Sequence, residues 1–155
     1  MKHKFLLACC AMTLLAGCSS QKKITAAEID AEIAASNAEL ERKVGDKVYF
    51  AFNEYTLSDN AKEILRHQAE YFKKQGNDAL PIVVEGHCDE RGTREYNLAL
   101  GERRAEAVKK YLECQGVRNP ITTISFGKER PAQIPASAHD EAAFAANRRA
   151  VVVVE

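Results

Sequence analysis

The stretch from Val83 to Gly92 constrains the fold of this chain more than any other. A short apolar run ends at Gly86, a charged turn follows, and a helical pattern then runs from Tyr96 to Gln115. Glycine at 86 and at 92 permits backbone torsions closed to other residues, so the turn can bring main-chain amides close to a bound group. The helix that follows offers unpaired N–H groups and a partial positive charge at its N-terminus. The sequence therefore predicts a small binding site between a strand and a helix.

The polar residues around this turn carry both charges. Asp89 lies in the turn, while Asn97, Gly101 and Arg104 follow one another at helical spacing and share one stripe of the helix. One carboxylate and one guanidinium that face the same space suit a zwitterionic ligand. The alternative is that Asp89 caps the following helix and that Arg104 belongs to a solvated ion pair, worth less than about 1 kcal/mol.

The N-terminus has the pattern of a secretory signal over residues 1–17. Lys2 and Lys4 form its basic part, residues 5–15 its apolar part, and Ala16 and Gly17 are small residues at a cleavage point. An apolar run of about eleven residues is too short to span a bilayer as a helix, which needs about twenty.

Cys18 follows directly, and Leu15-Ala16-Gly17-Cys18 resembles a bacterial lipobox, in which the chain is cut before a cysteine whose sulfur is then acylated. Ser19 at the next position fits sorting to the outer membrane, so we expect a lipid-anchored protein whose domain faces the periplasm. Several acyl chains, at about 0.8 kcal/mol per buried methylene, make such an anchor permanent. Ordinary cleavage that leaves a free N-terminal cysteine is the alternative.

Residues 18–46 are predicted to be the lipidated cysteine and a flexible tether, and residues 47–155 one domain. The tether segment is rich in Ala, Glu, Lys and Ser. Ile29 and Ile33 permit a weak amphipathic helix, but the rest of the segment is too polar to bury a core.

Two cysteines fall within the predicted domain. Cys88 and Cys114 lie near opposite ends of the long helix, roughly 27 Å apart at about 1.5 Å per residue. Because a disulfide needs Cα atoms within about 7 Å, we expect no bond between them.

Hydrophobic periodicity predicts a two-layer α+β domain with the order β-α-β-α-β-(short α)-β. Crossovers that contain helices make at least some neighbouring strands parallel, so we expect a four-stranded mixed sheet with two main helices on one face. The unbroken valines of the last strand indicate an inner position or burial on both faces. The expected strands are 48–52, 82–85, 122–126 and 149–154. Helices are expected between the cap Ser58 and Gly76, over 96–115, and between Asp140 and Asn147. The long helix is expected to bury Leu98, Ala105, Val108 and Leu112.

Several spaced motifs from Val48 onward resemble the OmpA-like peptidoglycan-binding domains. They are Gly86-His87-Cys88-Asp89-Glu90-Arg91-Gly92-Thr93, Glu95-Tyr96-Asn97-Leu98, Leu100-Gly101-Glu102-Arg103-Arg104-Ala105, Phe126-Gly127-Lys128-Glu129 and Asn147-Arg148-Arg149-Ala150. The lipobox and the segment after it also match outer-membrane lipoproteins of this family.

The resemblance implies non-covalent binding of the diaminopimelate-containing peptide of peptidoglycan, which links the outer membrane to the cell wall. Asp89 would take the ammonium group of diaminopimelate and Arg104 its carboxylate, so replacing either is expected to abolish wall binding and leave the fold intact. The other implied binding residues are Asn97, Leu98, Cys88, Arg148, Phe52 and Asn53. Lipoproteins of the family work with TolB and other Tol proteins in envelope integrity and cell division, and no cofactor is implied.

This chain departs from the family pattern at three positions. Many relatives have an acid where it has Ala51, another where it has Asn53, and Thr where it has Cys88. Loss of an acid at 51 removes one partner for a ligand ammonium, and Cys is a weaker hydrogen-bonding residue than Thr. We therefore expect weaker binding, or acceptance of a modified stem such as an amidated one.

An enzyme is the first rival interpretation. His87, Asp89 and Ser125 have the residue types of a catalytic triad. However, the chain has no Gly-x-Ser-x-Gly turn and Ser125 lies inside a predicted strand, so we expect no catalysis.

Metal and nucleic-acid binding are also disfavoured. His87 and Cys88 point apart if extended, and His67, Cys114 and His139 lack the spacing of metal ligands. The chain has 22 basic and 22 acidic residues, so it lacks the concentrated positive charge of a nucleic-acid protein.

The last alternative is a protein-interaction module with little wall binding of its own. Its candidate surface is the charged helix face formed by Glu102, Arg103, Glu106, Lys109 and Lys110. Such a face is also typical of a solvated helix.

Overall fold

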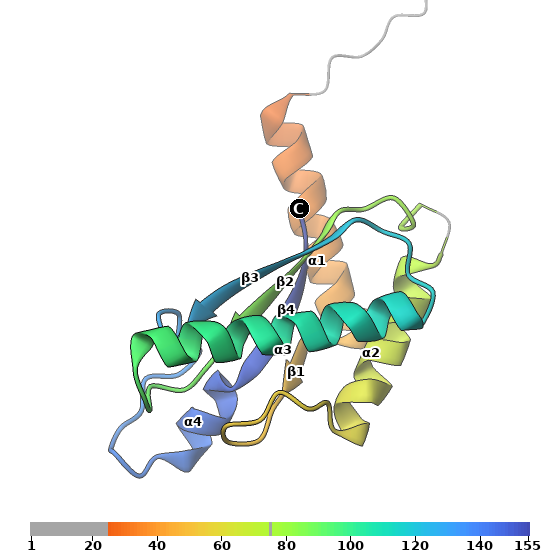
Figure 1. Ribbon diagram of the computed structural model, residues 1–155. Coiled ribbons are helices and arrows are strands. Elements are labelled where there is room, and N and C mark those ends of the chain that lie inside the picture. The colour runs from red at the N-terminus through yellow and green to blue at the C-terminus, as the bar shows by residue number, and fades with distance from the viewer. Residues whose placement is uncertain (1–24, 75) are drawn as a thin grey trace, which may run out of the picture.

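A computed structural model describes residues 25–74 and 76–155, which form an open four-stranded sheet with helices packed around it (Figure 1). The elements are α1 (Ala26–Val44), β1 (Lys47–Tyr49), α2 (Asp59–Phe72), β2 (Ile82–His87), α3 (Arg94–Cys114), β3 (Ile121–Gly127), α4 (Glu141–Asn147) and β4 (Arg149–Val154). The strand order is β1-β4-β2-β3, with β2 and β3 parallel and β4 antiparallel to both of its neighbours. The predicted α+β class and mixed sheet are confirmed.

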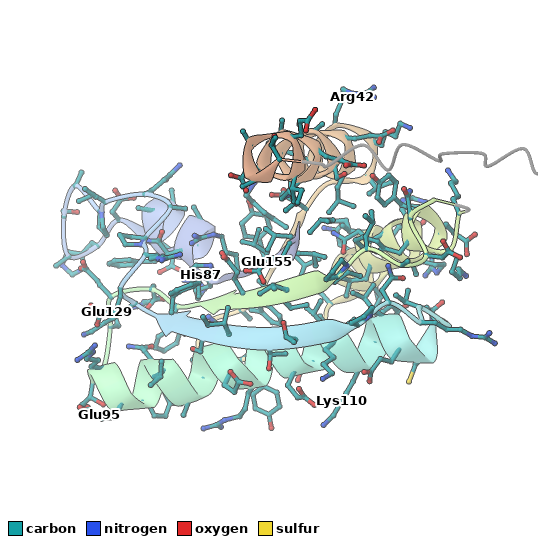
Figure 2. All side chains as sticks on the ribbon, turned by 90° about the horizontal axis from the view of Figure 1, so that it is seen from above. Arg42, His87, Glu95, Lys110, Glu129 and Glu155 are labelled. Carbon is teal, nitrogen blue, oxygen red and sulfur yellow. The ribbon has the colours of Figure 1, made fainter. Side chains whose placement is uncertain are left out.

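The core lies between the sheet and helices α2 and α3 and includes Leu40 of α1. Figure 2 shows α3 running along one face of the sheet. Alternate residues of β4, such as Val152, point into the core, because successive side chains of a strand face opposite ways. They meet Leu65 and Phe72 of α2 and Val108 and Leu112 of α3. The inner position predicted for the last strand is confirmed, since β4 lies between β1 and β2.

Helix α1 corrects the prediction of a flexible tether over residues 26–44. Thr25 and Glu28 form a capping box, in which each side chain accepts a hydrogen bond from the backbone N–H of the other residue. The C-terminal half packs against α2 and β4 and buries Leu40 completely, while the first turns project beyond the sheet (Figure 1). Burial of Leu40, with Val44 packed against the same core, therefore attaches an otherwise polar helix to the domain. The predicted signal and Cys18 lie outside the described residues.

The side chain of Asn37 in α1 makes two hydrogen bonds to the backbone at the end of β4. The Val154 N–H donates to Asn37 Oδ1 at 2.7 Å, and Asn37 Nδ2 donates to the Val154 carbonyl at 2.9 Å. β1 pairs only with residues 149–151 of β4, so it does not reach Val154. The side-chain amide thus completes the hydrogen bonding that a longer β1 would supply.

Replacing Asn37 by leucine should lower the free energy of unfolding by about 1–3 kcal/mol, because both backbone groups of Val154 would be left without a partner in a partly buried place. Urea denaturation measures this. Ala35→Leu, at an exposed position of the same helix, is the control. Equal stability of the two variants would contradict the assigned role.

Two element boundaries, at the end of β1 and the start of α3, differ from the sequence prediction. β1 ends at Tyr49 instead of continuing to Phe52, because the chain turns away and Asn53 adopts a left-handed conformation with φ of 59°. α3 begins at Arg94 and is capped by the Thr93 hydroxyl, which accepts from the Tyr96 N–H.

No helix within the described ranges is both long and apolar enough to cross a bilayer.

Candidate ligand-binding site

A glycine contact brings α3 unusually close to the sheet. A Cβ at position 86 would lie 1.9 Å from the Gly101 carbonyl oxygen, and a Cβ at position 101 would lie 2.3 Å from Ser125 Oγ. Only glycine fits both positions, because real Cβ contacts of this length do not occur. This close approach sets Arg104, one turn further along α3, beneath the end of β2.

Arg104 is completely buried and is held by backbone carbonyls. Its Nε donates to the Glu54 carbonyl at 2.8 Å, Nη1 to that of His87 at 2.8 Å, and Nη2 to that of Ala51 at 3.2 Å. The guanidinium also lies over the Phe50 ring, with Cζ 5.1 Å from its centre. Burial lowers the pKa of Arg104, but an arginine stays charged at neutral pH. Since a guanidinium has five N–H groups, two are not used by these carbonyls, and the Cys88 side chain is their hydrogen-bonding neighbour.

Asp89 faces two other arginines. Its carboxylate lies 2.6 Å from Arg91 Nη2 and 3.3 Å from Arg148 Nη1, and it accepts the Arg91 backbone N–H at 3.2 Å. Burial alone would raise the pKa of Asp89, but these hydrogen bonds outweigh burial and lower it. Asp89 is therefore a buried, ionised carboxylate, and it is Thr93, not Asp89, that caps α3.

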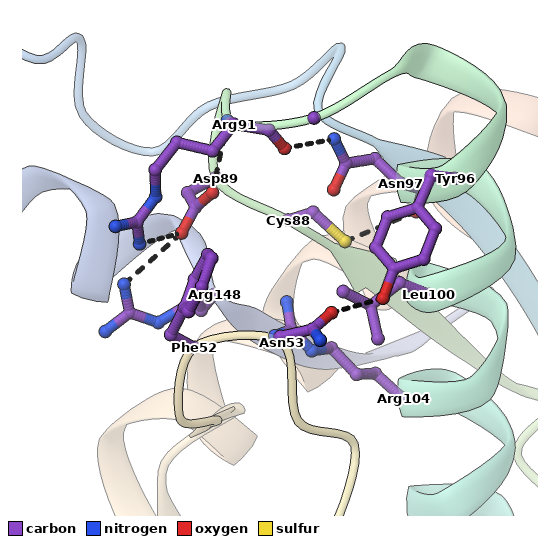
Figure 3. Close-up of a pocket in the computed structure, with 11 residues that line it drawn as sticks. Phe52, Asn53, Cys88, Asp89, Arg91, Tyr96, Asn97, Leu100, Arg104 and Arg148 are labelled. Carbon is purple, nitrogen blue, oxygen red and sulfur yellow. Dashed lines mark hydrogen bonds and ion pairs between the residues drawn. The ribbon is translucent and has the colours of Figure 1, made fainter. Parts of the chain in front are cut away.

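These residues surround one cavity of about 240 Å³ (Figure 3). Asp89 and Arg104 both line it, so the structure places in one cavity the two charged residues that the sequence assigned to one site. Three guanidinium groups and one carboxylate line the cavity, and Glu141 pairs with Arg148 at 2.7 Å and with Arg91 at 3.3 Å. Three positive charges against two negative ones leave a small positive excess, which favours a ligand with a carboxylate beside its ammonium group. Its lining residues are Phe52, Asn53, Cys88, Asp89, Arg91, Gly92, Tyr96, Asn97, Leu100, Arg104 and Arg148.

Asn97 presents an acceptor to this cavity. Its Nδ2 donates to the Arg91 carbonyl at 2.8 Å and to the Thr93 carbonyl at 3.1 Å. The amide oxygen points into the cavity (Figure 3) and has no partner in the described part of the chain. Beside it, the Cys88 thiol donates to the Asn97 carbonyl at 3.3 Å, and burial raises the pKa of that thiol. Cys88 and Cys114 are both free thiols.

Aromatic residues of two elements border the cavity. The Tyr96 hydroxyl donates to Asn53 Oδ1 and thereby joins α3 to the loop after β1 (Figure 3). The Arg91 guanidinium lies between two rings, 4.1 Å from the centre of Phe52 and 4.5 Å from that of Phe144. Stacking on two rings fixes the orientation of Arg91 toward Asp89.

Leu98 is the one sequence-predicted site residue that does not line this cavity. It is 51% exposed instead of buried, and it borders a separate groove toward β3. The helical stripe through Asn97 and Arg104 includes Leu100, three residues after one and four before the other, so Leu100 occupies the apolar wall. Arg91 and Tyr96 also line the cavity, although the sequence did not predict them as site residues.

The residues of the hypothetical catalytic triad are not brought into hydrogen-bond contact. Ser125 Oγ donates to the Leu98 carbonyl at 2.7 Å, whereas His87 Nε2 lies 3.2 Å from Glu85 and its ring stacks on Phe126. In the described ranges, no three His, Cys, Asp or Glu residues form a group that could hold a metal ion.

His87 makes stability depend on pH. Burial, and then the positive charges of Arg149 and Arg130, lower the pKa of His87 to about 4 from an ordinary 6.5. Between these values the unfolded chain binds a proton that the folded chain does not, so acidification favours unfolding. We expect the free energy of unfolding to fall by up to about 3 kcal/mol as pH drops from about 6.5 to about 4.

Urea denaturation across this pH range tests the effect. His87→Phe should flatten the profile in that window, since phenylalanine keeps an aromatic ring beside Phe126 and cannot be protonated. His139→Phe, at an exposed position, is the control. An unchanged slope in His87→Phe would assign the pH dependence to other groups.

Fold and cavity together define a small α+β binding domain, and comparison with known proteins places it. A sequence model of the OmpA family matches residues 49–148. The peptidoglycan-associated lipoprotein of Pasteurella multocida is 41% identical over 150 residues, which cover 96% of this chain and 95% of that protein. That of Rhizobium meliloti is 42% identical over 151 residues, which cover 92% of this chain and 83% of that protein.

Solved structures agree. The crystal structure of the peptidoglycan-associated lipoprotein from Burkholderia pseudomallei matches with a TM-score of 0.63 and 42% identity, over 71% of this chain and 90% of that one. The C-terminal domain of Helicobacter pylori MotB, at 20% identity and a TM-score of 0.60 over 71% of this chain and 84% of that one, shares the fold alone. The chain therefore belongs to the OmpA family. Its full-length relatives above are peptidoglycan-associated lipoproteins.

Proposed function

We infer that this protein is an outer-membrane lipoprotein that binds peptidoglycan non-covalently and so links the outer membrane to the cell wall. The observation that carries the inference is the single cavity of about 240 Å³ in which a buried carboxylate and three guanidinium groups converge. Peptidoglycan association is what the names of its relatives state. TolB and other Tol proteins are proposed as its protein partners in envelope integrity and cell division.

The proposed ligand group is the side chain of diaminopimelate in the peptide stem. This amino acid ends in an ammonium and a carboxylate on one carbon, which matches a cavity that holds both charges. Asp89 would accept the ammonium group, sharing its carboxylate with Arg91 and Arg148. The two remaining N–H groups of Arg104 would bind the carboxylate in a charge-assisted pair.

The other lining residues have supporting roles in this proposal. The unpaired amide oxygen of Asn97 would accept a further ligand N–H, and Leu100 would pack against the aliphatic chain. Asn53 uses its side-chain oxygen for Tyr96, and Ala51 contributes only its carbonyl, to Arg104. With no acid at either position, Asp89 is the one carboxylate that lines the cavity among residues 25–74 and 76–155. This supports the expectation of modest affinity or tolerance of an amidated stem.

Co-sedimentation with purified peptidoglycan tests this function. The domain should pellet with the cell wall, and free diaminopimelate should release it by competition, while free lysine should release much less. A domain that stays in the supernatant at all wall concentrations would contradict wall binding and would favour the alternative of a protein-interaction module.

The lipid anchor is a separate prediction. Cys18→Ala should move the protein from the membrane fraction to the soluble periplasmic fraction, because acyl chains attached at the cysteine supply nearly all of its membrane affinity. Immunoblots of fractionated cells measure this, with Cys9→Ala, inside the predicted signal, as the control. A Cys18→Ala protein that remains in the outer membrane would refute lipidation at this residue.

A further inference from the structure

β3 is an edge strand with little of the usual protection, since its register shift lies near its end, at Phe126. It lies at the end of the order β1-β4-β2-β3, and within the described ranges no strand pairs with its outer side. Edge strands normally carry charged residues, proline or bulges that prevent pairing with other chains. The seven residues of β3, Ile121–Gly127, include no charge and no proline, and five of them are β-branched or aromatic. Such an edge can accept an additional strand.

A groove runs beside this edge between α3 and β3. Two adjoining cavities of about 430 and 540 Å³ share Glu95, Leu98 and Ser125 as lining residues. Leu98 on α3 and Ile124 on β3 are 51% and 42% exposed, so apolar surface borders the groove on both elements. The groove is distinct from the ligand cavity, with which it shares no lining residue.

The helical wall of the groove is acidic. Glu95 has no partner among residues 25–74 and 76–155, and Glu102 accepts only the Thr123 hydroxyl, at 2.7 Å. The nearby cations are already engaged. Arg94 pairs with Glu129 at 3.2 Å, and Lys128 donates to two backbone carbonyls. A partner segment would therefore need basic side chains.

We propose that β3 binds an extended segment of a partner protein as a fifth strand, with apolar side chains between Leu98 and Ile124 and basic side chains against Glu95 and Glu102. Strand addition uses backbone hydrogen bonds for affinity and alternate side chains for specificity. The two glutamates lie about 10 Å apart along α3, at about 1.5 Å per residue. Fourth neighbours on one face of a strand lie about 13 Å apart, within reach of flexible lysine side chains.

Charge argues against a second copy of this chain as the occupant. Antiparallel pairing of two β3 edges about a twofold axis would bring the two α3 helices side by side on one face. The acidic walls would then meet, and like charges in juxtaposition oppose association. A basic extended segment has no such conflict.

Titration of the domain with a defined peptide tests the proposal. The probe is acetyl-Lys-Thr-Val-Thr-Lys-Thr-Val-Thr-amide, which places lysine and valine alternately on one strand face. The control peptide has proline in place of the threonine at its fourth position. The chemical shifts of backbone amides in β3 should change when the probe peptide is added and should not change with the proline-containing control peptide. Ile124→Lys should weaken binding at least tenfold, as should the Glu95→Lys, Glu102→Lys pair.

Matched variants make the outcomes distinct. Ile134→Lys, at a residue that is 87% exposed and outside the groove, should leave peptide binding unchanged. Retained co-sedimentation of Ile124→Lys with peptidoglycan shows that this variant folds and separates the groove from the ligand cavity. Absence of shifts in β3 would overturn the proposal. So would a dimer of the unmodified domain in sedimentation velocity that Ile124→Lys dissociates, because the edge would then be a self-association surface.

Discussion

Replacing Arg104 by methionine is expected to destabilise the domain by about 3 kcal/mol or more and to abolish peptidoglycan binding. The three carbonyls that receive its N–H groups belong to Ala51, Glu54 and His87, of which the bond to His87 is buried and the other two are part-buried. A buried acceptor left unpaired costs about 1–3 kcal/mol. Sequence alone predicted that loss of this arginine would leave the fold intact. The structure leads us to expect a loss of stability instead, because Arg104 hydrogen-bonds both the loop after β1 and the end of β2.

Two controls separate charge from hydrogen bonding at this position. Arg104→Lys keeps a positive charge but cannot reach three carbonyls with one ammonium group, so most of the destabilisation should remain. Arg103→Met, at the exposed neighbouring position, should unfold at nearly the same urea concentration as the unmodified domain. If Arg104→Met were as stable as Arg103→Met, the bonded network around the guanidinium would have no energetic importance.

Asp89→Asn should weaken binding of the peptide stem by about 2–5 kcal/mol, which corresponds to at least about 30-fold in Kd. The change keeps the shape of the side chain and removes its charge. The ligand ammonium would lose its partner, while Arg91 and Arg148 would face it with Glu141 as their remaining carboxylate. Stability should change much less than in Arg104→Met, because Asn still accepts a hydrogen bond.

Glu90→Gln is the matched control for Asp89→Asn. It removes one negative charge from the adjacent exposed residue, whose side chain does not line the cavity. Isothermal titration with a soluble stem peptide measures both variants. Equal affinities of Asp89→Asn and Glu90→Gln would remove Asp89 from the binding site.

The sequence predicted the sheet and the placement of Asp89 and Arg104 at one site because both follow from short-range patterns. Alternating apolar residues define strands, and helical spacing places Asn97, Gly101 and Arg104 on one stripe. The same spacing includes Leu100 and excludes Leu98, which is why Leu100 and not Leu98 lines the cavity.

Other features depend on contacts that no local pattern contains. The carbonyls that hold Arg104 come from backbone of the loop after β1, and any residue type could supply them. The capping box at Thr25 and Glu28 was readable, but the stability of α1 depends on burial of Leu40 against distant elements. The position of Arg91 between Phe52 and Phe144 likewise joins three segments far apart in the chain.

In the proposed site, the cavity recognises both the ammonium and the carboxylate at the end of the diaminopimelate side chain. Isothermal titration with two stem peptides tests this recognition most directly. One contains diaminopimelate and the other contains lysine, which keeps the ammonium group and lacks the adjacent carboxylate. We predict saturable binding of the diaminopimelate peptide to the unmodified domain and at least about 30-fold weaker binding of the lysine peptide, since the pair with Arg104 is lost. Equal affinity for the two peptides would contradict the proposed site.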